Sequence, residues 1–128
     1  MDRGLDQIAP IMSTEVVASL RSLIEPYARD LQWTADGLEG FYTNTKKPDP
    51  KGKPEFFAAA QVKKTAVSFY LMPVYCFPDL LDNVSPELKK RMQGKSCFNF
   101  KEADPALFKE LEALVRRSAD RYRKEGKI

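Results

Sequence analysis

The stretch KKPDPKGKP, residues 46–54, constrains the fold of this chain more than any other segment. Its three prolines have no N–H to donate to a ladder, and its glycine disfavours regular structure. Its four lysines favour contact with water. The segment therefore predicts an exposed loop that interrupts any helix or sheet ladder, with separate elements on either side.

The residues around this loop have the character of β-strands. In 65–72 the apolar side chains of Val67, Phe69 and Leu71 alternate with a semi-polar set that includes Ser68 and Tyr70. We expect the apolar side to face helices and the semi-polar side to line an open groove. In 55–62, the run Ala58–Ala60 leaves room for a helix backbone or a ligand to come close, and packing against a helix is the favoured interpretation. The predicted strands are 31–35, 40–45, 55–62, 65–72 and 95–100.

Three helices are predicted from capping residues and apolar spacing. They begin at Ser13 or Thr14, at Ser85–Pro86 and at Asp104–Pro105, and they end before Pro26, at Gly94 and at Gly126. The fold class is therefore α+β: an antiparallel sheet of about five strands with an N-terminal helix, a middle helix and a long C-terminal helix packed against it. Residues 1–12 are predicted to be an irregular arm, and 13–128 to be one domain.

The triplet Gly94–Lys95–Ser96 matches the end of a phosphate-binding P-loop, but the context does not fit. A P-loop needs a glycine five residues before its Gly-Lys pair, and Lys89 stands there. A P-loop also follows a strand and opens a helix, whereas a helix is predicted before Gly94 and a strand after it. The triplet therefore predicts a helix end, a turn and the entry to a strand.

The chain has no histidine and only two cysteines, Cys76 and Cys97. Serine–histidine and cysteine–histidine nucleophile pairs and histidine metal centres are therefore excluded. We expect both cysteines to be reduced thiols in or near the core, with no disulfide. We expect no catalytic residues, no metal site and no cofactor.

The first residues, MDRGLDQIAPIMS, do not combine a basic start with an apolar run. No apolar segment reaches membrane-spanning length. We therefore expect a cytoplasmic protein without a signal peptide and without a membrane partner.

The net charge of +3 is unevenly distributed. Residues 46–64 have six lysines and two acids, and residues 89–101 have five basic residues and no acid. If the two basic stretches meet in the fold, they would attract an anion or a nucleic acid. Solvated surface lysines are the favoured interpretation, because the sequence has no recognisable nucleic-acid motif.

Six residues near the turn at Gly94 are the candidate ligand-binding set. They alternate on two predicted strands or flank them: Tyr70, Met72, Tyr75, Lys95, Cys97 and Asn99. A second possibility is an aromatic pocket wall made by Trp33, Tyr42, Tyr70 and Tyr75, with ordinary packing as the favoured use. An enzyme using Lys95 and Cys97 is a third, minor hypothesis, because a nearby lysine can lower a thiol pKa.

Two long segments give a family resemblance. GKPEFFAAAQVKKTAVSFYLMPVY, residues 52–75, and SPELKKRMQGKSCFNFKEADPALFKELEALVRRS, residues 85–118, resemble the YdhG-like family of bacterial domains of unknown function. The resemblance spans roughly residues 16–122 and implies an α+β domain without established chemistry. One branch of that family looks like a frataxin analogue that delivers iron for iron–sulfur cluster assembly. Such a role rests on clustered acids, whereas the matching part of this chain is its most basic part.

The leading functional hypothesis is therefore a non-enzymatic binding module for an unknown small molecule or protein. The alternatives are a frataxin-like iron chaperone and weak binding of a nucleic acid or anion through 46–64 and 89–101. A homodimer formed through an exposed sheet face or edge is compatible with each of them.

Overall fold

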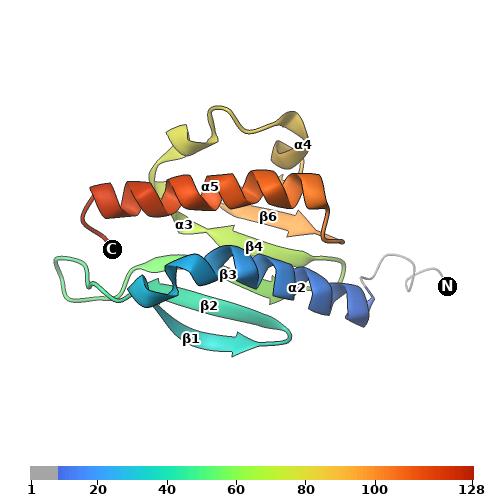
Figure 1. The fold of residues 1–128 in the computed structure, drawn as a ribbon, viewed down its shortest axis with the longest axis horizontal. Coiled ribbons are helices and arrows are strands. Elements are labelled where there is room, and N and C mark those ends of the chain that lie inside the picture. The colour runs from blue at the N-terminus through green and yellow to red at the C-terminus, as the bar shows by residue number, and fades with distance from the viewer. Residues whose placement is uncertain (1–8) are drawn as a thin grey trace.

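The computed structural model describes residues 9–128, which form one six-stranded antiparallel sheet with helices on one face (Figure 1). The strand order is β1-β2-β3-β4-β6-β5, and all five pairs of neighbours are antiparallel. The α+β class and the antiparallel sheet with an N-terminal and a long C-terminal helix are confirmed. Among the described helices, none is both long and apolar enough to cross a membrane.

The elements follow one another along the chain in a simple order. The strands are β1 (Leu31–Gly37), β2 (Gly40–Thr45), β3 (Phe56–Val62), β4 (Val67–Leu71), β5 (Met92–Gln93) and β6 (Cys97–Phe100). The α-helices are α2 (Pro10–Ile24), α3 (Met72–Cys76), α4 (Pro86–Lys89) and α5 (Pro105–Lys124), and the 3-10 helices are η1 (Glu25–Asp30) and η2 (Pro78–Leu81).

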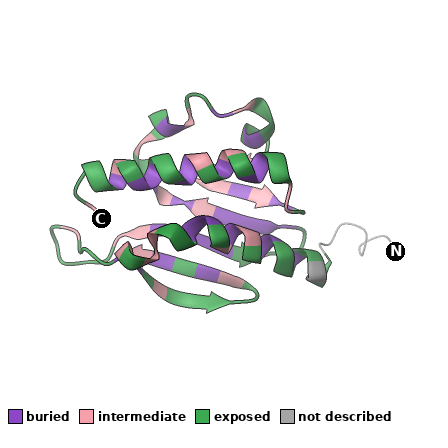
Figure 2. Ribbon diagram, viewed as in Figure 1, coloured by how far each residue is buried: buried purple, intermediate pink, exposed green. Residues whose placement is uncertain are grey.

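The core lies between the sheet and the two long helices, α2 and α5, which run across the same face (Figures 1 and 2). Each helix presents an apolar stripe to the sheet, with Leu20 and Ile24 on α2 and Leu111 and Leu114 on α5 fully buried. The outward sides of both helices are exposed, as Figure 2 shows. Burial of these stripes is the main source of stability for such a layered fold.

The alternation of side chains in the strands decides which residues join this core. Val67, Phe69 and Leu71 are fully buried on the helix side, as their spacing predicts. In β3, Ala58 and Ala60 belong to the same core cluster and Ala59 does not. The alanine run therefore serves both uses, with two side chains toward the helices and one toward the other face.

Several predicted helix starts and stops are confirmed by the positions of the helices and by their capping hydrogen bonds. Helix α2 stops at Ile24, immediately before the 3-10 helix that contains Pro26. The Ser85 hydroxyl accepts a hydrogen bond from the Leu88 N–H at 3.1 Å at the start of α4. The Asp104 carboxylate accepts from two N–H groups in the first turn of α5. These caps occupy helix N–H groups that have no partner within the helix.

The first helix starts earlier than predicted. Helix α2 begins at Pro10, so residues 10–12 are helical and not part of an irregular arm, while 1–8 lie outside the described residues. Proline suits the first helical position because the N–H it lacks would have no partner there. The hydroxyls of Ser13 and Thr14 donate to the Pro10 carbonyl within the helix and do not cap its start.

Two further predictions are corrected near the middle of the chain. The middle helix ends at Lys89, and Met92–Gln93 forms a sixth strand that pairs with β6 through a turn at Gly94. Gly94 has φ +81°, so it is a hairpin-turn glycine and not a helix end. Strand β4 stops at Leu71, and Met72 begins helix α3, where proline follows it.

Candidate ligand-binding face

The face of the sheet opposite α2 and α5 contains the candidate site. The strand register places Tyr42, Ala59, Tyr70 and Cys97 in one row across four neighbouring strands, β2, β3, β4 and β6. Residues directly opposite each other in antiparallel strands share a face, so all four side chains point away from the core. Tyr42 is 42% exposed, which shows that this face is open to solvent at β2.

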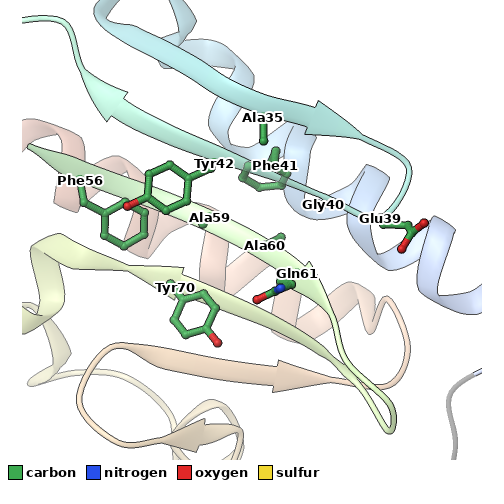
Figure 3. Close-up of a pocket in the computed structure, with 10 residues that line it drawn as sticks. All are labelled: Ala35, Glu39, Gly40, Phe41, Tyr42, Phe56, Ala59, Ala60, Gln61 and Tyr70. Atoms are coloured by element: carbon green, nitrogen blue, oxygen red, sulfur yellow. The ribbon is translucent and has the colours of Figure 1, made fainter. Parts of the chain in front are cut away.

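An apolar hollow of about 530 Å³ occupies the β1–β4 side of this face (Figure 3). The rings of Tyr42 and Phe56 stack with centroids 4.8 Å apart and planes inclined by 23°. In Figure 3, Ala59 lies between this aromatic pair and Tyr70, with the sheet beneath it and the helices behind. The lining residues are Ala35, Glu39, Gly40, Phe41, Tyr42, Phe56, Ala59, Ala60, Gln61 and Tyr70.

A second, more polar hollow of about 490 Å³ continues the same face over β4, β6 and β5. Tyr70 borders both hollows, so the two are adjacent. The residues that line the second hollow are Lys63, Thr65, Ala66, Ser68, Tyr70, Lys90, Arg91, Met92, Gln93, Cys97, Asn99 and Lys101.

Hydrogen bonds hold the polar side chains of the second hollow in place. The Ser68 hydroxyl donates to Asn99 Oδ1 at 2.7 Å, and Asn99 Nδ2 donates to Gln93 Oε1 at 2.9 Å. The Cys97 thiol lies 3.8 Å from the same Asn99 oxygen. These contacts join β4, β6 and β5 across the face and fix the Asn99 amide between two partners.

The second hollow concentrates positive charge. Lys63, Lys90, Arg91 and Lys101 line it, and no carboxylate is among its described lining residues. The two basic stretches of the sequence therefore meet here, through Lys63 at the β3–β4 hairpin rather than through the 46–54 loop. Lys46 and Lys47 of that loop line a separate hollow beside Arg29 and Asp30.

The six predicted ligand-binding residues divide into separate places. Tyr70, Cys97 and Asn99 come together in the second hollow. Tyr75 and Lys95 line a third hollow of about 770 Å³ beside α3, η2 and the β5–β6 turn. Met72 is half-buried in α3 and borders none of the three hollows described.

Three further residues of the open face were absent from the predicted set. Phe56, Ala59 and Lys63 stand on β3 or directly after it, and pairing with β2 and β4 brings them beside the tyrosines. The sequence predicts Tyr42 only as part of an aromatic wall with Trp33, Tyr70 and Tyr75. Trp33 instead packs against Phe41, ring centroids 5.5 Å apart, on the helix side. Period-two alternation within β3 was the signal available for Ala59.

The positions of the cysteines and acidic side chains test the predictions about thiols and metal binding. Both cysteines are free thiols, Cys97 half-buried on the open face and Cys76 exposed on α3, so the prediction of a near-core Cys76 is wrong. Within residues 9–128 there is no group of three or more His, Cys, Asp or Glu side chains suited to a metal ion. The iron-chaperone alternative therefore stays a prediction without a candidate site among these residues.

Several clear pKa shifts belong to groups away from the open face. Burial raises the pKa of Tyr122, whose hydroxyl donates to the Phe56 carbonyl at 3.2 Å from the helix side. The Arg121 guanidinium on α5 lowers the pKa of Asp79 through a direct hydrogen bond. These groups stabilise the packing of α5 against its neighbours and do not line either hollow of the open face.

We found no match to this chain among protein-family models, curated proteins or solved structures. The resemblance to the YdhG-like family therefore stays a prediction from the sequence.

Proposed function

We propose that this chain is a binding module whose open sheet face holds a small ligand with a flat apolar part and a negatively charged part. One observation carries the proposal. An apolar, aromatic hollow and a hollow with four cations adjoin at Tyr70 on a single face of the sheet. A ligand of this kind could contact both hollows at once.

The apolar half suits a flat group for physical reasons. Tyr42, Phe56 and Tyr70 surround Ala59, whose small side chain leaves space above the sheet. Aromatic rings favour stacked or edge-to-face contact with other rings. Such contact also removes apolar surface from water, at about 25 cal/mol per Å².

The polar half suits an anion. Four cations line the second hollow and no carboxylate is among its lining residues, although Glu102 and Asp104 share the adjoining hollow with Arg91 and Lys101. The resulting positive potential attracts negative groups over a Debye length of about 8 Å at physiological salt. The amide and hydroxyl groups of Asn99 and Ser68 lie between the aromatic half and two of these cations, Lys63 and Lys101. They supply donors and acceptors for polar atoms in the middle of the ligand.

The experiment uses an aromatic sulfonate, 8-anilinonaphthalene-1-sulfonate, as a probe of this chemistry. The native protein is titrated with the probe and followed by ¹H–¹⁵N correlation NMR. We expect the shifted amides to lie on the open face, around Ala59, Tyr70 and Asn99, with those of Glu112 on α5 unchanged. Shifts confined to the helix side, or no binding at millimolar probe, would refute the proposal.

The two native cysteines provide an independent check without mutation. Cys97 lines the second hollow, whereas Cys76 lies on α3 and borders neither hollow of the face. Saturating probe should slow alkylation of Cys97 by iodoacetamide and leave the rate at Cys76 unchanged, as measured by peptide mass spectrometry. Equal protection of both thiols would indicate aggregation or general coating by the dye.

A further inference from the structure

We infer that the ligand of the open face is single-stranded nucleic acid, with bases on the aromatic half and phosphates on the basic half. The inference rests on the proposed function and names the ligand class. It depends on how aromatic, polar and cationic side chains follow one another along the strands.

The order of side chains along the strands matches the order of groups in a nucleotide. The row Ala59–Tyr70–Cys97 is followed, two residues further along each strand, by the row Gln61–Ser68–Asn99. Two residues of strand advance about 7 Å. The first row suits a base, and the hydroxyl and amides of the second suit a sugar and the polar edges of a base.

Two of the cations come next in the same direction, because Lys63 follows Gln61 by two residues and Lys101 follows Asn99 by two. The other two, Lys90 and Arg91, lie at the β5 edge of the same hollow, where the Asn99 N–H donates to the Arg91 carbonyl at 2.8 Å. Phosphate groups of a strand whose bases lie on the aromatic rows would therefore meet cations at two adjoining sides of the hollow. An electropositive border beside exposed aromatic rings is how proteins bind single strands without strong sequence preference.

The spacing of the aromatic residues admits more than one base. Tyr42 and Tyr70 lie on strands separated by β3, about 10 Å apart across the sheet. Ala59 between them provides a flat floor. An open antiparallel sheet with aromatic side chains on neighbouring strands can stack two or three unpaired bases, whereas a duplex keeps its bases paired inside.

Charge complementarity favours a polyanion over a second copy of this chain. The lining residues of the two hollows include four cations and one carboxylate, that of Glu39. A twofold dimer through this face would bring together two such sets and bury cations without enough acidic partners, which is unfavourable. A strand of phosphates supplies the missing negative charge.

The first measurement is fluorescence anisotropy with a fluorescein-labelled ten-nucleotide oligothymidylate and the native protein at pH 7.5. We expect the oligothymidylate to bind more tightly than a duplex of the same length, because only unpaired bases can reach Tyr42 and Tyr70. A labelled ten-residue polyglutamate tests charge alone and should bind more weakly than the oligonucleotide. Equal affinity for all three probes would overturn the inference, because it would show a general anion surface.

Substitutions of the tyrosines test stacking. Tyr42→Leu and Tyr70→Leu keep an apolar side chain but remove the ring, and each should weaken oligonucleotide binding by about 5- to 150-fold. The matched control is Tyr75→Leu, a 55%-exposed tyrosine on α3 outside both hollows, which should change affinity less than twofold. Thermal unfolding of each variant shows that it remains folded. Unchanged affinity in both folded site variants contradicts base stacking on this face.

Salt dependence tests the cations. A strand whose phosphates contact the four cations should bind with a slope of log affinity against log salt near −3, from about −0.7 per contact. Lys63→Gln should reduce the steepness by about 0.7. Lys51→Gln removes the same charge from the exposed 46–54 loop and should leave the slope unchanged. Equal slopes for the two variants would show that phosphate contacts lie elsewhere.

Comparison of the aromatic sulfonate with the oligonucleotide distinguishes failure of the proposed function from failure of the nucleic-acid inference. If the dye binds the open face and the oligonucleotide does not bind, the nucleic-acid inference fails while the proposed function stands. If neither probe shifts amides of the face, both fail. If the oligonucleotide shifts amides only around the 46–54 loop, the inference fails, because binding would not involve the aromatic half.

Discussion

The division of the alanine run in β3 between two faces gives a quantitative test of the fold. Ala58 is fully buried in the core cluster and pairs with Thr43 and Leu71, which are also fully buried. Ala58→Val forces two extra methyl groups into this packed space. Overpacking of this kind costs about 1–3 kcal/mol. For a chain of 128 residues this corresponds to a decrease in Tm of about 4–11 °C.

Ala59→Val is the matched variant, with the same two methyl groups added one residue away. Its side chain points into the apolar hollow between Tyr42 and Tyr70, where space is available. Valine also suits a strand better than alanine. Although Ala59 is only 6% exposed, it lies outside the core cluster and borders the hollow, so we expect a change in unfolding free energy of less than about 0.5 kcal/mol.

Differential scanning calorimetry of the two variants and the parent chain measures the difference directly. The Tm of the Ala59 variant should exceed that of the Ala58 variant by at least about 2 °C. The Ala59 variant should also bind the aromatic sulfonate more weakly, because its methyl groups fill the hollow. Equal losses of Tm, or a larger loss at Ala59, would refute the assignment of the two faces and the ligand site with it.

Two further predictions concern the β1–β2 hairpin. Gly40 has φ +153°, and a Cβ there would lie 2.2 Å from the Ala60 carbonyl oxygen. Gly40→Ala should therefore lower the free energy of unfolding, measured in urea, by about 1–3 kcal/mol. A Cβ at Gly37 meets no atom within 4 Å, so Gly37→Ala should lower it much less. Hydrogen bonds from Arg21 hold the pKa of Asp36 below its usual value, so this stabilisation is present above the ordinary carboxyl pKa and is lost as pH falls through the lower folded pKa. Asp36→Asn should therefore reduce the dependence of Tm on pH in the acid range below the ordinary carboxyl pKa, and an unchanged dependence would contradict the role of this pair.

Local sequence signals predicted helix boundaries and strand faces correctly wherever a residue and its near neighbours determine the backbone conformation. Pro26 marks the end of the regular first helix, and Ser85 and Asp104 begin helices because their oxygens accept from N–H groups within the next turn. Alternation in 67–71 assigned the two faces of β4 correctly. These features depend on neighbours a few residues away, which the sequence displays directly.

Predictions failed where a distant partner competed with a local preference. Met92 and Gln93 follow a short helix and have helical spacing, yet they pair with β6 once Gly94 closes the turn. Met72 continues the alternation of β4, but the strand ends before it and α3 begins. In each case tertiary pairing or packing outweighed a preference worth a fraction of a kcal/mol per residue.

The candidate site shows the same division. The residue types, the basic stretches, the absence of histidine and the semi-polar side of β4 that contains Tyr70 can all be read from the amino-acid sequence. The folded chain is needed to bring Lys63 and Lys90 to one hollow, and to place Tyr42 and Tyr70 on either side of Ala59. Strand order and register bring residues from distant parts of the chain together. These depend on the total burial achieved by the whole sheet against α2 and α5, and no local pattern reports that quantity.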